Sequence, residues 1–148
     1  MTERKFNLEP LLELQTLSKD AAVARFKIEP GDIEKGVEYG KLKKLELLNN
    51  DETEPTELYF RGGNLRIAYI GRTALQDGNK AALFEALGET EHKLRSGAGK
   101  GATLYVYPEK GVAFSATGQR LDFLEVFPPC SFKDYQSEVY EEPPKFIR

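Results

Sequence analysis

A glycine-rich stretch is the first candidate for chemistry in this sequence of 148 residues, because glycines let backbone N–H groups converge on an anion. The stretch runs from Ser96 to Thr103 and contains one lysine, Lys100. A phosphate-binding P-loop needs Ser or Thr directly after its lysine, whereas this chain has Gly101 there. A strand is also predicted to follow, so no helix dipole would face the anion. The stretch therefore does not predict a nucleotide site.

Cys130 and His92 are the remaining candidates for catalysis, since the chain has one residue of each kind. A nucleophilic thiol needs a base within hydrogen-bond reach and a third group that orients the base. Cys130 follows two prolines and has no predicted helix N-terminus beside it to activate the thiol. No spacing of carboxylates or histidines singles out an acid–base pair or a metal site. We therefore predict no catalytic residue, no metal and no cofactor.

A polar segment, residues 89–101, carries a group of basic side chains. These candidates for holding an anion or an acidic partner are His92, Lys93, Arg95 and Lys100. If all four lie on one flexible loop, they could converge on a negatively charged ligand. The alternative interpretation is a solvated loop without a ligand.

Aliphatic and tyrosine side chains alternate along two predicted strands, so the two kinds face opposite sides of each strand. We expect the aliphatic side chains to face the helices. This predicts an outer surface formed by Tyr59, Arg61, Tyr105 and Tyr107. Tyrosine and arginine are enriched in protein interfaces because each combines a large contact area with a polar end. Two other interpretations stay open: residues 128–148 cover this surface, or it stacks unpaired bases of a nucleic acid.

Composition narrows the choice of compartment and partner. A net charge of -3 and a pI of about 5.4 disfavour general nucleic-acid binding. The longest apolar run has four residues, and a membrane span needs about 20. The first ten residues lack the apolar region of a secretory signal, and a lone cysteine fits a reducing compartment. We expect a cytoplasmic protein without a membrane span.

The spacing of apolar residues predicts a single α+β domain over residues 1–148. Two or three short helices should pack on one face of a mainly antiparallel sheet of about six strands. The helices are predicted over residues 7–17, 18–26 and 80–87. The strands are predicted over residues 37–40, 42–48, 58–61, 65–70, 102–107, 112–116 and 121–127, although the run over 42–48 also fits one or two helical turns. Short connections between neighbouring strands make them antiparallel, residues 49–56 form an exposed loop, and residues 128–148 form a segment that packs back on the domain.

Two parts of the chain resemble each other. Residues 20–26 and 80–87 are similar amphipathic helices, and each is followed by an acidic turn and later by an apolar-Tyr-apolar step. The similarity suggests a tandem pseudo-repeat with units at about 18–70 and 71–127. Chance similarity between two short helices is the alternative.

Three motifs of the second unit occur in the order Gly71-Arg72-Thr73, Leu87-Gly88-Glu89-Thr90 and Leu104-Tyr105-Val106-Tyr107. This order resembles the small outer-membrane assembly lipoproteins of the SmpA/OmlA type and the β-lactamase inhibitor proteins that share their helix-then-meander fold. The resemblance implies a non-enzymatic, protein-binding fold. It carries no functional residue over individually.

The sequence therefore predicts a non-catalytic protein-binding module that uses the tyrosine-bearing sheet face and the basic segment 89–101. The alternative is a small-molecule or anion-binding protein, including an enzyme, that uses the segment from His92 to Lys100. A pocket on which the basic side chains converge would favour this alternative. The sequence names neither the protein partner nor the oligomeric state.

Overall fold

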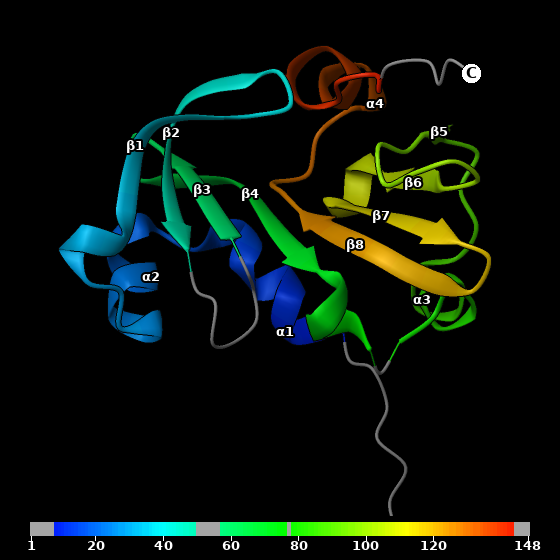
Figure 1. Cartoon of the computed structure of the whole chain (residues 1–148), viewed down its shortest axis with the longest axis horizontal. Helices are drawn as coiled ribbons and strands as arrows, with labels where there is room; N and C mark the ends of the chain where they lie inside the picture. Colours follow the sequence, from blue (N-terminus) through cyan, green and yellow to red (C-terminus); the bar gives the residue numbers. More distant parts are fainter. Residues whose placement is uncertain (1–7, 50–56, 77, 144–148) are drawn as a thin grey trace, which may run out of the picture.

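An eight-stranded antiparallel sheet runs through the protein (Figure 1), whose computed structural model describes residues 8–49, 57–76 and 78–143. The strands lie in the order β1-β2-β3-β4-β8-β7-β6-β5. Their bounds are β1 Ile33–Tyr39, β2 Leu42–Asn49, β3 Glu57–Arg61, β4 Asn64–Gly71, β5 Lys93–Arg95, β6 Thr103–Tyr107, β7 Val112–Thr117 and β8 Arg120–Val126. Each half of the chain forms a four-stranded meander, and the last strand of each, β4 and β8, pair antiparallel at the centre of the sheet.

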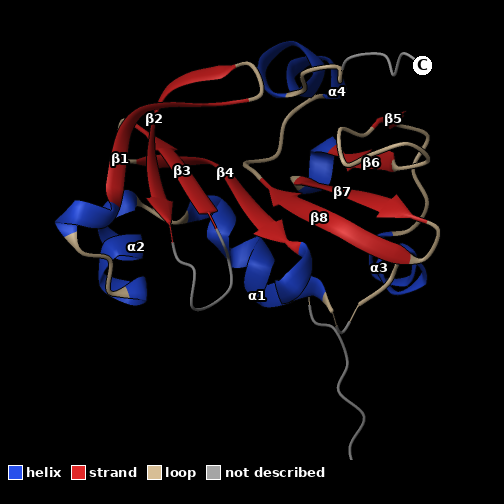
Figure 2. Ribbon diagram, in the orientation of Figure 1, coloured by secondary structure: helices blue, strands red, loops and turns tan. Residues whose placement is uncertain are grey.

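Helices lie on both sides of this sheet (Figure 2). Three of them share one face, and their bounds are α1 Glu9–Leu12, α2 Lys19–Phe26 and α3 Lys80–Leu87. The opposite face, called the outer face below, carries α4 Phe132–Asp134 and the π-helical turn η5 Tyr135–Val139. The 3-10 turns are η1 Glu13–Thr16, η2 Pro30–Asp32, η3 Arg72–Leu75 and η4 Pro108–Lys110. Among the described residues, no helix has the length and apolar character that crossing a membrane requires.

Local capping explains where the two longest helices begin. The Ser18 hydroxyl accepts a hydrogen bond from the Ala21 N–H at 3.1 Å, so it satisfies a donor that the first turn of α2 leaves free. The Asn79 side chain does the same for the Ala82 N–H at 2.8 Å at the start of α3. The predicted helices over residues 18–26 and 80–87 are therefore confirmed in type and position.

Both faces of the sheet are covered by apolar packing. The core on the helix face contains residues such as Leu14, Phe60 and Leu83, none more than 1% exposed. A second core on the outer face packs under the C-terminal segment, by which we mean residues 128–143. Its buried members are Leu42, Leu45, Leu47, Tyr59, Ile67, Leu104, Val106, Ala113, Phe127, Tyr135 and Val139. The sheet is consequently the middle layer of three.

The α+β class and the antiparallel sheet were predicted correctly, but the prediction of about six strands was wrong because the sheet has eight. Strand β5 lies within segment 89–101, which we expected to be a loop. Its pattern is charged-apolar-charged, as is common at a sheet edge, so hydrophobic periodicity did not reveal it. The predicted loop 49–56 lies outside the described residues except for Asn49, which ends β2.

Candidate functional site

The predicted tyrosine surface does not form, because its tyrosines lie on opposite faces of the sheet. Tyr59 belongs to the core of the outer face, whereas Tyr105 and Tyr107 pack with the core beneath the helices. In β6 the aliphatic residues Leu104 and Val106 are the ones on the outer face. Because both faces of β6 are apolar, alternation along the strand could not indicate which side meets the helices.

The polar groups of the predicted surface make separate structural contacts. The Tyr107 hydroxyl donates to the Gly88 carbonyl at 2.6 Å, and burial raises the pKa of Tyr107 to about 12. The Tyr59 hydroxyl donates to Glu57 at 2.7 Å. The guanidinium of the exposed Arg61 donates to the Lys43 carbonyl at 2.6 Å. These residues therefore contribute to the fold at different places.

The four basic candidates are also dispersed. His92 stacks on Phe132 with ring centroids 4.1 Å apart and lines a cavity of about 350 Å³ whose lining does not include Lys93, Arg95 or Lys100. The Lys93 ammonium lies 5.9 Å from the centre of the Tyr105 ring. Arg95 forms an ion pair with Glu142 at 3.7 Å, and Lys100 lies in the turn after β5. The convergent site expected on segment 89–101 is not formed around this cavity.

The outer face instead brings together an aromatic row, which consists of Tyr39, Tyr59, Tyr69 and Phe123. Ring centroids are 5.0 Å apart for Tyr39 and Tyr59, 6.2 Å for Tyr39 and Tyr69, and 5.3 Å for Tyr69 and Phe123. The four rings come from β1, β3, β4 and β8. Tyr59 is buried, whereas the other three are half-buried and reach solvent.

A buried carboxylate adjoins this row. Glu125 lies opposite Tyr69 in the β4–β8 register and is 5% exposed. The Tyr135 hydroxyl donates to its Oε1 at 2.5 Å, and the Tyr39 hydroxyl donates to its Oε2. Burial raises the pKa of Glu125, and the two hydrogen bonds offset part of that effect. This carboxylate thus connects β1 and the C-terminal segment to the central strand β8.

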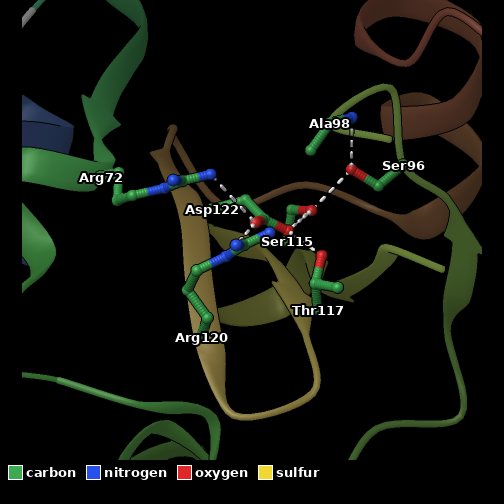
Figure 3. Close-up of polar contacts among 7 residues, drawn as sticks. All are labelled: Arg72, Ser96, Ala98, Ser115, Thr117, Arg120 and Asp122. Carbon is green, nitrogen blue, oxygen red and sulfur yellow. Dashed lines mark hydrogen bonds and ion pairs between the residues drawn. The ribbon is translucent and has the colours of Figure 1, made fainter. Parts of the chain in front are cut away.

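A second buried carboxylate, Asp122, lies where the register between β7 and β8 shifts (Figure 3). Its Oδ2 accepts hydrogen bonds from Ser115 at 3.0 Å and from Thr117 at 2.9 Å. The Ser115 hydroxyl is in turn 2.6 Å from that of Ser96, whose oxygen accepts from the Ala98 N–H. The chain of hydroxyl groups links the loop after β5 to the centre of the sheet.

Two arginines approach the other oxygen of Asp122. Its Oδ1 lies 3.4 Å from Arg120 Nε and 3.9 Å from Arg72 Nη2, and it accepts no hydrogen bond from the part of the chain that the structure describes. The Asp122 side chain is 4% exposed, whereas Arg72 and Arg120 are 60% and 55% exposed. Two exposed cationic groups therefore lie beside the buried anion, whose neighbour in the sequence is Phe123 of the aromatic row.

Ser115 has the Ser96 hydroxyl and the Asp122 carboxylate as its hydrogen-bond partners, and neither is an imidazole. Nucleophilic catalysis by Ser115 would need a base that takes its proton, and in serine hydrolases this base is an imidazole. The single histidine, His92, stacks on Phe132 instead. Burial also raises the pKa of Cys130, which leaves less of the reactive thiolate. Within the described ranges, no three His, Cys, Asp or Glu side chains are grouped so that they could hold a metal ion.

Replacing Asp122 by alanine is expected to lower the free energy of unfolding by about 1–3 kcal/mol. Ser115 and Thr117 would lose a shared acceptor in a buried site. Equilibrium unfolding in urea measures the effect. The control is Arg120→Ala, expected to change stability by less than about 1 kcal/mol, because the Arg120 guanidinium is 55% exposed, makes no hydrogen bond to Asp122 and leaves Arg72 beside the same oxygen. Equal losses in the two variants would show that the hydroxyl network does not stabilise the sheet.

Apart from Tyr59, sequence reasoning missed the residues of this site, although β8 carried a signal. Asp122 and Glu125 are charged residues inside the predicted strand 121–127, whose other residues are apolar, and buried charges require partners. Comparisons of the chain with family models, with curated proteins and with solved structures found no match. The function proposed below therefore rests on the geometry of the outer face.

Proposed function

We propose that this protein is a non-catalytic module that binds a protein partner through the outer face of its central strands. The observation that supports this proposal is the aromatic row, in which Tyr39, Tyr69 and Phe123 reach solvent side by side. Exposed aromatic side chains supply much of the binding energy of protein interfaces. The row, together with Arg72 and Arg120, is called the docking face below.

The rigidity of the docking face also supports binding. Tyr69 and Phe123 stand on β4 and β8, the paired strands at the centre of the sheet. Arg72 and Arg120 lie within 3.9 Å of the buried Asp122, which attracts both guanidinium groups to this part of the surface. Side chains that are already ordered lose less conformational entropy when a partner binds. The partner we expect has an apolar patch that covers the rings and acidic groups that meet the two guanidinium groups.

This proposal keeps the predicted kind of function and moves its site. Tyr59 is common to the predicted surface and the aromatic row, whereas Tyr105 and Tyr107 lie on the helix face. The alternative of a small-molecule or anion-binding role at segment 89–101 has weaker support, because the cavity beside His92 lacks the other three basic side chains.

We also propose that the chain is a tandem pseudo-repeat. The order of elements supports it, since α2 precedes the meander β1 to β4 and α3 precedes the meander β5 to β8. A helix followed by a meander is also the arrangement that the resemblance to the SmpA/OmlA-type lipoproteins and the β-lactamase inhibitor proteins implies. That resemblance stays a proposal, and so does the protein-binding role that it implies.

The docking face is tested by affinity capture from native lysate with quantitative mass spectrometry. The double variant Tyr69→Ala with Phe123→Ala should reduce recovery of a specific partner by about tenfold or more, because aromatic residues at the centre of an interface are hot spots. The matched control is Phe26→Ala, which removes a half-buried ring from α2 on the helix face. Equal recovery by wild type and the double variant would contradict the proposal, whereas loss with the Phe26 variant would place the interface on the helices.

A further inference from the structure

A cavity of about 210 Å³ lies between the outer face of the sheet and the C-terminal segment. Its lining includes the aromatic side chains of Tyr39, Phe123, Tyr135 and Tyr140. The buried carboxylate Glu125 lines it as well. Exposed residues at its edge, including Gly40 and Gly97, leave it open to solvent. The cavity thus combines aromatic rings with one desolvated anion.

The hydrogen-bond donors of its tyrosines are already used. Tyr39 and Tyr135 donate to Glu125, and the Tyr140 hydroxyl donates to the Arg95 carbonyl at 2.7 Å. A tyrosine hydroxyl has one proton to donate, so these three residues present rings and oxygen lone pairs to a ligand. Glu125 can accept further hydrogen bonds through its remaining lone pairs. The cavity therefore suits a ligand that brings positive charge.

The charged residues around the cavity also favour a positively charged ligand. Glu125 and Glu141 both line it, and Arg95 is the one cationic residue among the described residues that line it. The Arg95 guanidinium lies 3.7 Å from Glu142 Oε1 and donates to the Pro143 carbonyl, so its charge is directed to the C-terminal segment. Burial raises the pKa of Glu125, which means that the fold leaves its negative charge incompletely compensated. A cation in the cavity would offset this cost.

We propose that this cavity binds an organic ammonium group, of the kind found in choline or in a methylated lysine side chain. Aromatic rings attract cations through their quadrupole, and an ammonium bearing methyl groups matches both the apolar rings and the carboxylate. Glu125 supplies the opposite charge, and Tyr39, Phe123, Tyr135 and Tyr140 supply the walls. The inference goes beyond the proposed function, because the cavity needs no protein partner to bind a free ammonium ligand.

The test is an NMR titration of the full chain with choline and with its neutral isostere, in which carbon replaces the nitrogen. Choline should cause saturable shifts of the Gly40 and Gly97 amide signals, which report on the edge of the cavity. The neutral isostere should bind at least about tenfold more weakly, because it lacks the charge that Glu125 and the rings recognise. Equal binding of choline and its neutral isostere would overturn the inference. The absence of shifts with both choline and a peptide that carries a trimethylated lysine would overturn it as well.

Variants locate the binding to the cavity. Glu125→Gln keeps the shape of the side chain and should weaken choline binding by about tenfold. Phe123→Leu should weaken it by about threefold through the loss of one ring. The control Phe26→Leu on the helix face should bind as wild type, and each variant's spectrum shows whether it is folded. Wild-type affinity in both cavity variants would overturn the inference.

A second pair of ligands identifies the source of the ammonium group. One is choline, and the other is a short peptide with a trimethylated lysine. If the methylated peptide binds about tenfold more tightly than choline, the natural ligand is a methylated protein side chain. If choline and the methylated peptide bind equally, the cavity recognises the free ammonium group of a small molecule. Either result supports the inference.

Discussion

Replacement of Tyr135 by alanine is expected to lower the free energy of unfolding by about 3–5 kcal/mol. The Tyr135 side chain is 1% exposed, and its ring centroid lies 5.2 Å from that of Phe127 in the core of the outer face. The substitution would create a cavity between the C-terminal segment and the sheet and would leave Glu125 with one of its two tyrosine donors. Urea unfolding followed by circular dichroism measures the loss.

Tyr135→Phe is the matched control, because it keeps the ring and removes the hydroxyl. We expect it to lower stability by about 1 kcal/mol, the usual contribution of one hydrogen bond. Hydrogen exchange should show where the alanine variant opens, with faster exchange in β6 and β7, beneath the C-terminal segment. If the alanine variant were as stable as the phenylalanine variant, the packing of this segment would contribute nothing to the stability of the sheet.

Glu125→Leu is the second substitution with a large expected effect. It removes the acceptor of the Tyr39 and Tyr135 hydroxyls, and each buried hydroxyl without a partner costs about 1–3 kcal/mol. Glu125→Gln should lose less, because the amide oxygen still accepts and the amide group has no charge to desolvate. Urea unfolding near neutral pH compares the two variants. A leucine variant as stable as wild type would show that the tyrosine–glutamate contact is dispensable.

Wild type and Glu125→Gln should also differ in how their stability depends on pH, and the sign of this difference is defined. The folded state raises the pKa of Glu125 above its ordinary value of 4.5, so the folded protein keeps a proton that the unfolded chain has lost. The contribution of Glu125 to stability is therefore complete below pH 4.5 and is lost as the pH rises through the folded-state pKa. The Gln variant has no such group.

We accordingly expect the stability of Glu125→Gln relative to wild type to increase as the pH rises from 4.5 through this window, and then to level off. The difference is measured by urea unfolding of both proteins at a series of pH values, because subtraction removes the contributions of the other carboxylates. A difference independent of pH, or one that shrinks as the pH rises, would mean that burial does not dominate the ionisation of Glu125.

The parts of the fold that the sequence predicted well are those with local causes. The helices over 18–26 and 80–87 begin at residues whose side chains cap the first turn. The apolar residues of each helix are three or four positions apart, so they share one face. Short turns connect β3 to β4 and connect β6, β7 and β8 in succession. The length of these turns alone determined that the connected strands pair antiparallel. These features need no knowledge of distant residues.

The orientation of the strands was decided by tertiary packing. Alternation in β6 shows that Tyr105 and Val106 face opposite sides, but it does not say which side meets the helices. In the structure both sides are buried, with α3 beneath Tyr105 and the C-terminal segment above Val106. The predicted surface of Tyr59, Tyr105 and Tyr107 was therefore wrong, because it assumed one apolar face and one solvated face for every strand.

The candidate site depends on contacts between residues far apart in the chain. The sequence by itself determined that β8 would carry two carboxylates in an apolar strand, and therefore that each would need partners. Only the tertiary structure decided which partners they have: Glu125 meets a tyrosine 86 residues before it and another 10 residues after it. Such pairings follow from how the layers pack and exclude water, and no local pattern encodes them.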